Sequence, residues 1–365
     1  MHHEEGKMKK LDRYILSSIF KTGFIALMIF SLLVMAVETF MNIDKFISND
    51  VGFSTITYSS FMALGDYFIM ITSVSMLFSV TYFLSNLSAN NELISLYTAG
   101  FSKRRITQPI FILAVVLSVS FMFLNETTFL KWKNQNEIVK TELFGVSGTH
   151  DARNIALNDV ASGYLVQSRR YNEDLEKLYE PLVMRTKDNH VVLRLEALNA
   201  TYEGDNWVFH DVMLYEIDGT VMNSEKLDSY VLDDFDFPPS LFKSQNMKIT
   251  TMEYRSAVEY LDRLSEVNPG SWVEKETEFL RRLSEPLGIF VLMMISILMN
   301  YSFKKNILLF SIVQSLLIAV VYYVSDMVFS IVCKQGMIAP YYVAVMPLLF
   351  TVILSFAISA IGKRF

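Results

Sequence analysis

Residues 88–110 read SANNELISLYTAGFSKRRITQPI, a polar and basic stretch that lies between two long apolar runs. The run before it covers Phe61–Leu84, and the run after it covers Ile106–Leu124. Helices of about 18 or more apolar residues can cross the ~30 Å of hydrocarbon in a bilayer. The stretch therefore predicts a short loop at a membrane surface that joins two spanning helices.

Four more apolar runs extend this pattern in both directions, at Ile15–Val37, Leu287–Phe303, Ile307–Val332 and Tyr341–Ile361. The six runs predict a membrane protein that is mainly α-helical, with three spans on either side of a soluble domain. We expect spans one to three in residues 1–125, the soluble domain in 126–285, and spans four to six in 286–365.

Charge divides the chain in the same way. The 365 residues are 52% hydrophobic and only 19% charged, with a mean hydropathy of +0.31, whereas soluble domains are about a quarter charged. Residues 126–285 hold 18 of the 32 basic and 29 of the 38 acidic residues, a net charge of −11, and the remainder carries +5. This pattern excludes a single soluble domain, a disordered chain and a basic nucleic-acid binder.

Basic residues in the short flanks of the spans indicate the orientation, because cytoplasmic loops carry an excess of Lys and Arg. Eleven lie on one side and only Lys45 and Lys334 on the other. We expect both termini in the cytoplasm of a bacterium, the chain in its inner membrane and the acidic domain in the periplasm. The eleven are Lys7, Lys9, Lys10, Arg13, Lys103, Arg104, Arg105, Lys304, Lys305, Lys363 and Arg364.

Short β-rich runs with turn residues between them occupy about 163–232, as in NWVFHDVMLYEI at 206–217. They predict an antiparallel β-sandwich or jellyroll. Residues 126–144 and 252–282 predict helical connectors, the second broken at Pro269-Gly270. Pro286 then falls in the first turn of the fourth span, where a missing N–H costs little.

Motifs of catalysis are absent from the sequence. It has no GxxxxGK[ST], HExxH or GxSxG, and a lone cysteine, Cys333, cannot form a disulfide within the chain or build a zinc site. We expect no enzymatic activity, no metal and no cofactor in this chain. The histidines are isolated, and none is assigned a function: His2, His3, His150, His190 and His210.

The loop at 88–110 itself predicts a short helix. Leu93, Leu96 and Tyr97 have the i, i+3, i+4 spacing of one helical face, and Gly100 follows as a C′ residue. Glu92 lies in the first turn, where an acidic group complements the helix dipole. Two interpretations follow: an ordinary interfacial helix, or a docking helix for a cytoplasmic partner.

This loop resembles that of the LptF/LptG (YjgP/YjgQ) permease family, in which an acidic residue is followed by an "aaG" end, "rri" and "Pi". LDRYILSSIFKT at 11–22 is similar to the family's start. FPPSLF at 237–242, MKITTMEYRSAVEYLDRL at 247–264 and FLRRLSEPLGIFVLMM at 279–294 resemble its exit from the β domain and the Arg-x-x-x-Pro entry to span four. The likeness covers nearly the whole chain, including the three-plus-three layout around a periplasmic β-jellyroll.

The resemblance implies the membrane subunit of an ABC transporter that extracts lipopolysaccharide from the inner membrane. The implied partners are a cytoplasmic ATPase dimer that holds ATP and Mg, a second LptF/LptG-like permease subunit, a periplasmic jellyroll bridge protein and the lipid substrate, with no nucleic acid. The loop at about 88–100 would be the coupling helix that enters the ATPase. The coupling residues implied are Glu92, Leu93, Leu96, Gly100 and Arg104.

Ionisable residues within apolar runs are further candidates, because charge in hydrocarbon is costly. Lys21 lies in span one, where snorkelling to the headgroups is the alternative. Glu38 and Asp66 lie near the outer ends of spans one and two, and Asp326 lies beside Tyr322 in span five. Because spans one and five line the cavity in the family, the resemblance implies gate or cavity roles for Lys21, Glu38, Tyr322 and Asp326, with interfacial capping as the alternative.

One feature departs from the family. Its members offer basic residues near the outer end of span one, whereas ETFMNIDKF at 38–46 has only Lys45, and the outer domain carries −11. The complementary charge would come from the partner subunit or from divalent ions, or else the cargo is a less anionic (glyco)lipid. A membrane-anchored periplasmic binding module or sensor is the alternative function. A lipoprotein-release ABC subunit fits less well, since its large domain follows span one.

Overall fold

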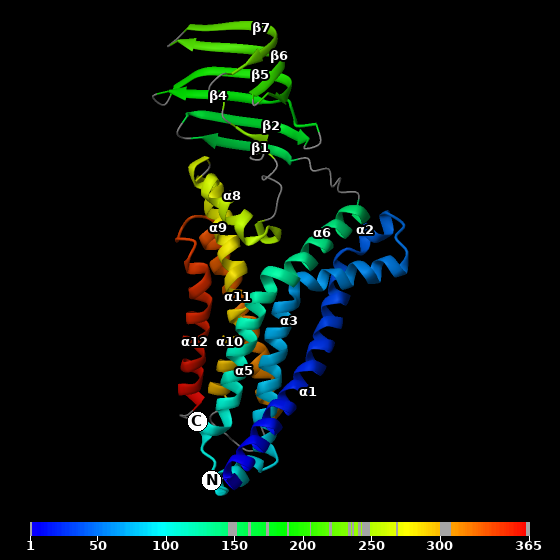
Figure 1. Ribbon diagram of the computed structural model, residues 1–365, viewed down its shortest axis with the longest axis vertical. Coiled ribbons are helices and arrows are strands. Elements are labelled where there is room, and N and C mark those ends of the chain that lie inside the picture. Colours follow the sequence, from blue (N-terminus) through cyan, green and yellow to red (C-terminus); the bar gives the residue numbers. More distant parts are fainter. Residues whose placement is uncertain are drawn as a thin grey trace. The chain divides into compact units, whose positions relative to one another are not determined.

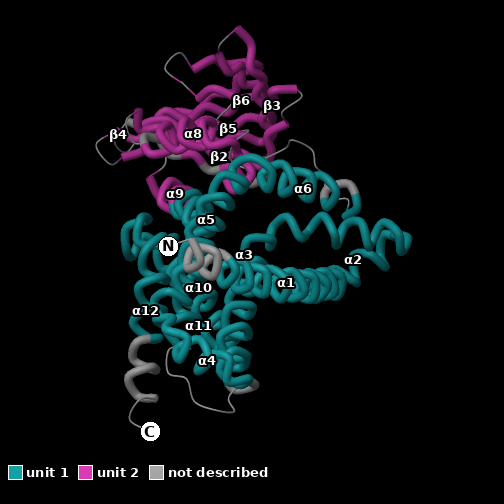
Figure 2. The backbone as a smooth tube through the Cα atoms, turned by 60° about the horizontal axis from the view of Figure 1, so that its bottom comes forward, with its two compact units in different colours: residues 1–144, 277–365 teal, residues 145–276 magenta. Residues whose placement is uncertain are grey.

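The computed structural model describes residues 2–144, 152–159, 162–172, 175–187, 190–204, 206–218, 221–232, 235, 237–239, 242, 249–267, 269–299 and 308–362. The chain forms two compact units. Residues 1–144 and 277–365 make a helical unit, and residues 145–276 make a unit that contains the β-sheet (Figure 2).

Among the described residues, the helical unit contains six long or apolar helices, and Figure 1 shows them running alongside one another. They are α1 (His2–Met41), α3 (Phe53–Ala89), α5 (Lys103–Leu124), α10 (Leu287–Met299), α11 (Leu308–Lys334) and α12 (Tyr342–Gly362). The helices α2 (Ile43–Ser48) and α4 (Glu92–Thr98) mark its two ends, which we name the α2 end and the α4 end. The first residues of α1 and the last turn of α12 lie at the α4 end (Figure 1).

Four helical stretches are long and apolar enough to cross a membrane: Lys10–Met41, Phe53–Ala89, Lys103–Lys140 and Ile312–Lys334. They contain the first three predicted spans and extend past the predicted ends of each, and the fourth stretch covers the fifth predicted span from Ile312 onward. The helix α9 (Pro269–Ser284) and α10 pass the same test only together, with a 54° bend between them. The helix α12 is apolar over Tyr342–Ser355. The described residues therefore give four candidate spans, or five if the bent pair is one.

The third span continues without a break into its connector. A π-helical turn at Asn125–Phe129 links α5 to α6 (Leu130–Phe144), and α8 (Tyr254–Val267) precedes α9. Both predicted helical connectors are confirmed, as is the break at Pro269, which begins α9.

The helix α3 is the centre of the helical unit, and small polar residues let its neighbours approach closely. In its most apolar window 72% of residues are buried, against 17% for α1. The hydroxyls of Thr72, Ser73 and Ser75 donate to carbonyls four residues back, and Ser79 Oγ donates to the Ile19 carbonyl on α1 at 2.6 Å. Since hydrocarbon offers no water, such internal partners are required.

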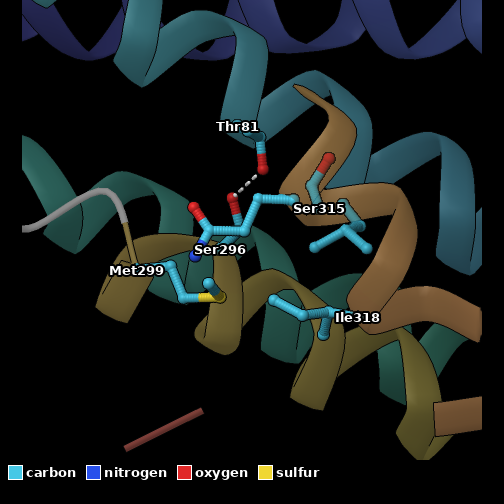
Figure 3. Close-up of a pocket in the computed structure, with 7 residues that line it drawn as sticks. Thr81, Ser296, Met299, Ser315 and Ile318 are labelled. Atoms are coloured by element: carbon cyan, nitrogen blue, oxygen red, sulfur yellow. Dashed lines mark hydrogen bonds between the residues drawn. The ribbon is translucent and has the colours of Figure 1, made fainter. Parts of the chain in front are cut away.

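Another hydroxyl pair joins α3 to α10. Thr81 Oγ1 and Ser296 Oγ lie 2.8 Å apart and point toward one another beside a small pocket, whose lining also includes Met299, Ser315 and Ile318 (Figure 3). The pocket lies where α3, α10 and α11 meet, so its polar atoms contribute to helix association.

In the part of the chain that the structure describes, seven antiparallel strands form the sheet, and neighbours in the sequence are mostly neighbours in space. They are β1 (Ala152–Asp159), β2 (Tyr164–Asn172), β3 (Lys177–Tyr179), β4 (Leu182–Lys187), β5 (His190–Glu203), β6 (Asn206–Asp218) and β7 (Val221–Val231). The short strands β3 and β4 each pair with both β2 and β5, so both of them lie between these two strands in the sheet.

The sheet buries one face under its own C-terminal extension. Phe235, Phe237 and Phe242 follow β7 and pack into the core of the sheet, and Trp207 Nε1 donates to the Phe237 carbonyl at 2.6 Å. The predicted antiparallel β domain is confirmed, and in the described residues its strands belong to one sheet.

A close approach at Gly65 on α3 provides a test of helix packing. A Cβ there would lie 2.8 Å from Cγ of Trp132 on α6, whereas a Cβ at Gly52 would have no atom within 4 Å. We expect Gly65→Ala to destabilise the helical unit by about 1–3 kcal/mol through overpacking. Thermal unfolding in detergent should show a lowered midpoint temperature for Gly65→Ala and an unchanged midpoint for Gly52→Ala. Equal transitions would contradict the packing described.

Candidate functional site at the helix ends

The helix α4 is sharply defined at both ends. Asn91 precedes it in the left-handed region with φ +57°, and Gly100 follows it with φ +90°. The N–H of Phe101 donates to the Leu96 carbonyl, and that of Gly100 donates to the Tyr97 carbonyl, each at 3.0 Å. This pair of bonds is a Schellman motif, which satisfies the last carbonyls of the helix. The predicted helix and the predicted C′ position of Gly100 are confirmed.

One face of α4 is fixed to the bundle. Leu93 is buried in the core formed by α1, α3, α5 and α10, and Leu96, Tyr97 and Phe101 pack against that core. Glu92 accepts a hydrogen bond from the Tyr14 hydroxyl on α1 at 2.8 Å. Leu93 and Leu96 therefore anchor the helix to its own chain, and they do not form an outward surface.

The outward face of α4 carries Ile94, Ser95 and Thr98. Ile94 is 56% exposed, a large apolar side chain between two anchored residues. The sequence reasoning did not single it out, although its position off the face of Leu93, Leu96 and Tyr97 would have indicated it.

Basic residues follow α4 at the start of α5. Ser102 caps α5 by accepting from the Arg105 N–H, and Arg105 Nη2 pairs with Asp12 Oδ2 on α1 at 2.7 Å. Arg104 and Lys103 are exposed at the same end. The side chains of Lys7, Lys9, Lys304, Lys305, Lys363 and Arg364 lie outside the described residues.

The predicted gate residues separate into two groups. Lys21 is exposed on α1. Glu38 is buried at the α2 end, where its Oε1 pairs with Lys140 Nζ on α6 at 2.8 Å and accepts from Asn42 Nδ2 at 3.2 Å. Glu38 therefore joins α1 to α6.

Asp326 and Tyr322 both belong to α11 but make different contacts. Asp326 Oδ2 accepts from Nε and Nη2 of Arg281 on α9, at 2.9 and 2.6 Å. Tyr322 is buried and lies against Gly288, where a Cβ would be 2.8 Å from its hydroxyl. Asp326 thus joins α11 to α9, and Tyr322 packs α11 on α10.

Two adjacent arginines connect three helices, which the sequence reasoning missed. Arg281 pairs with Asp326, while Arg282 Nη2 pairs with Glu126 Oε2 of the π-helical turn at 2.7 Å. Asn125 Nδ2 also donates to the Arg282 carbonyl at 2.9 Å. We call Arg281, Arg282, Glu126 and Asp326 the arginine brace. Its only sequence signal is the Arg-x-x-x-Pro spacing of Arg282 and Pro286, since its partners lie far away in the chain.

The charged groups of the two ends are one membrane thickness apart. From Arg105 on α5 to Glu126 in the π-helical turn, the continuous helix advances 21 residues, which is about 32 Å at 1.5 Å per residue. No charged residue lies between them. This length matches the ~30 Å of hydrocarbon in a bilayer. Among the described residues, no group of three or more His, Cys, Asp or Glu side chains could hold a metal ion.

Breaking the arginine brace should destabilise the helical unit. Arg282 is 3% exposed, so Arg282→Met leaves Glu126 without its partner, and we expect a loss of about 3–5 kcal/mol. The double variant Glu126→Gln/Arg282→Met should recover part of it. Arg255→Met, which removes an exposed pair with Glu259, should cost under about 0.5 kcal/mol. Similar unfolding transitions in detergent for Arg282→Met and Arg255→Met would refute a structural role of the brace.

A known protein family matches nearly the whole chain, including both ends of the helical unit. The profile of the family described as lipopolysaccharide export system permease LptF/LptG matches residues 13–360. Comparison with curated proteins gives no match. The family is one of permeases within an ABC transporter complex and not of catalytic ATPases. The resemblance inferred from the sequence is confirmed, and the chain belongs to the LptF/LptG family of lipopolysaccharide export permeases.

Proposed function

We propose that this chain is the transmembrane subunit of an ABC transporter that extracts lipopolysaccharide or a related (glyco)lipid from the inner membrane. The cargo then passes through the β domain, a periplasmic jellyroll in the family's terms, toward the outer membrane. The family match over residues 13–360 is the observation that carries this proposal.

The helix α4 is proposed as the coupling helix, with Glu92, Leu93, Leu96, Gly100 and Arg104 as its functional residues. A coupling element must be stiff, because force that bends the element does not reach the bundle. The burial of Leu93 and the Schellman end at Gly100 support this role. They also refine it, since Leu93 and Leu96 would transmit force to the bundle, while Ile94 would contact the ATPase. The ATPase dimer, a separate chain, would bind ATP and Mg.

Six spans with both termini in the cytoplasm complete the proposed topology. This topology is supported by the placement of three segments at the same end of the helical unit, namely the start of α1, α4 and the end of α12 (Figure 1). The helix α10, which follows the 54° bend after α9, would provide the fourth span, and α12 the sixth. The division into 1–125, 126–285 and 286–365 is part of the same proposal, and the acidic region would lie in the periplasm.

The exposed surface of the helical unit suits acyl chains. Side chains such as Phe24, Leu32 and Leu33 on α1 and Leu317 and Val320 on α11 are exposed. Removing an amphiphile with several chains from a bilayer costs roughly 0.8 kcal/mol per CH₂, tens of kcal/mol in all. The exposed apolar side chains of the helical unit would therefore replace the contacts that the acyl chains lose with the bilayer. A second LptF/LptG-like subunit would enclose these side chains, and ATP hydrolysis would drive the two subunits together around the lipid.

Several cations that could bind phosphate groups of the cargo are already paired with carboxylates. At the α2 end Lys140 pairs with Glu38, Arg281 with Asp326, Arg282 with Glu126, and Lys334 with Glu278. Complementary charge would come from the second permease subunit or divalent ions, unless the cargo is a less anionic lipid. As gate residues, Glu38 and Asp326 would act by holding α1 to α6 and α11 to α9. Lys21 and Tyr322 would line the cavity, and a periplasmic jellyroll bridge protein would accept the lipid.

Substitution of Ile94 tests the docking role of α4. Ile94→Asp places a charge on the outward face without touching the core, so we expect most of the co-purifying P-loop ATPase to be lost. Ile138→Asp on α6, where the side chain is 50% exposed at the other end of the unit, is the matched control. Glu92→Lys should also weaken docking, whereas Tyr14→Phe, which only removes a bond to Glu92, should not. Unchanged ATPase recovery with Ile94→Asp would remove the coupling role from this face.

A further inference from the structure

A small polar cavity lies at the junction of α3, α10 and α11 (Figure 3). Some of the side chains that line it are apolar, among them Met299 and Ile318. The others carry hydroxyl or amide groups, namely Thr81, Ser296, Gln314 and Ser315. Each of the three helices contributes at least one of these polar groups, which therefore converge on one space from separate parts of the chain.

The hydroxyl groups of the cavity are buried inside the bundle. Thr81 and Ser296 are 1% exposed, and Ser315 is 4% exposed. Thr81 lies eight residues before Ala89, the last residue of α3, which is about 12 Å along the helix axis. Both Thr81 and Ser315 belong to candidate membrane spans. Because hydrocarbon offers no hydrogen-bond partners, these groups need partners from the protein or from water that the protein holds.

The polar groups of the cavity can both accept and donate hydrogen bonds. Ser315 Oγ donates to the Ile312 carbonyl at 2.8 Å, and Thr81 Oγ1 shares a hydrogen bond with Ser296 Oγ at 2.8 Å. A hydroxyl oxygen has two acceptor positions, so an oxygen that donates its proton elsewhere serves the cavity as an acceptor. The carboxamide of Gln314 adds N–H donors and a carbonyl acceptor. The lining is therefore matched by a molecule that both donates and accepts.

The size and the chemistry of the cavity select water. The space open to the centre of a water-sized sphere is about 10 Å³, and one water molecule needs roughly 10–15 Å³ by this measure. An acyl chain or a lipid headgroup is too large for this space. None of the described side chains that line the cavity is charged, so a bare cation would be uncompensated there. Small polar cavities hold water, whereas apolar ones stay dry.

We propose that this cavity is a hydration site that holds one water molecule between α3, α10 and α11. The water donates to two of the hydroxyl oxygens and accepts from the amide of Gln314. Such a bridge is nearly as favourable in enthalpy as a direct hydrogen bond, so it gives α11 a polar contact with α3 and α10 inside the membrane. The site belongs to the helical unit itself and does not depend on the identity of the transported lipid.

Radiolytic labelling of the full chain in lipid nanodiscs tests this proposal. A short X-ray pulse converts bound water into hydroxyl radicals, which oxidise a nearby methionine sulfur to the sulfoxide. Met299 lines the cavity, whereas Met294, on the same helix and also partly buried, packs against the core formed by α1, α3, α5 and α10. We expect Met299 to be oxidised several times faster than Met294, as measured by mass spectrometry of their peptides.

A variant that removes two hydroxyls provides the second part of the test. Thr81→Val/Ser296→Ala deletes both members of one hydrogen-bonded pair, so this bond leaves no unpaired partner behind. The lining becomes mainly apolar, and we expect the oxidation rate of Met299 to fall to that of Met294. Thr72→Val is the matched control and should leave this rate unchanged, because the buried Thr72 hydroxyl donates to the Phe68 carbonyl and does not line the cavity.

Two results would overturn the hydration site. Equal oxidation of Met299 and Met294 in the unmodified chain would show that the cavity is dry. An unchanged rate at Met299 in Thr81→Val/Ser296→Ala would show that the radicals come from other water, such as that at the membrane surface. If the double variant does not fold, Gln314→Leu, at a partly exposed position, replaces it with the same predicted fall and the same contradicting result.

Discussion

The length of helix between two ion pairs determines how this chain can be placed in a bilayer. Arg105 pairs with Asp12 at one end of α5, and Glu126 pairs with Arg282 at the other. The uncharged helix between them matches the hydrocarbon thickness, so neither pair enters the region where charge is most costly. Because each pair joins α5 to another helix, the same contacts that set the depth of the chain also hold the bundle together.

Both candidate sites, at the α4 end and at the α2 end, depend on this arrangement. At the α4 end, Arg105 and Asp12 hold α5 to α1 next to the contact between Tyr14 and Glu92, so α4 is fixed relative to two spanning helices. At the α2 end, the arginine brace fixes α9 beside the π-helical turn and α11. A movement of α4 would therefore reach the brace through continuous helices, which is the mechanical requirement of a transporter driven from one side.

Local features could be predicted from the sequence, and long-range partners could not. The α4 cap at Gly100 and the break at Pro269 are set by neighbouring residues, and both were confirmed. The apolar runs were confirmed in part, since the described residues give four candidate spans, or five with the bent pair. The pairing of Arg282 with Glu126 joins residues 156 positions apart, which no spacing reveals. Alternating strands indicated one buried face of a sheet but not what covers it, and Phe235, Phe237 and Phe242 cover it here. Ile94 was overlooked because the predicted helix was described by its buried face.

The most direct test of the account is whether α4 and the β-sheet lie on opposite sides of the membrane. Thr98→Cys on α4 and Ser224→Cys on β7, each in the Cys333→Ala chain, place one thiol on each exposed site. With a membrane-impermeant maleimide in spheroplasts, the account predicts labelling at position 224 in intact cells and at position 98 only after permeabilisation. Labelling of both positions in intact spheroplasts, or of position 98 alone, would contradict it.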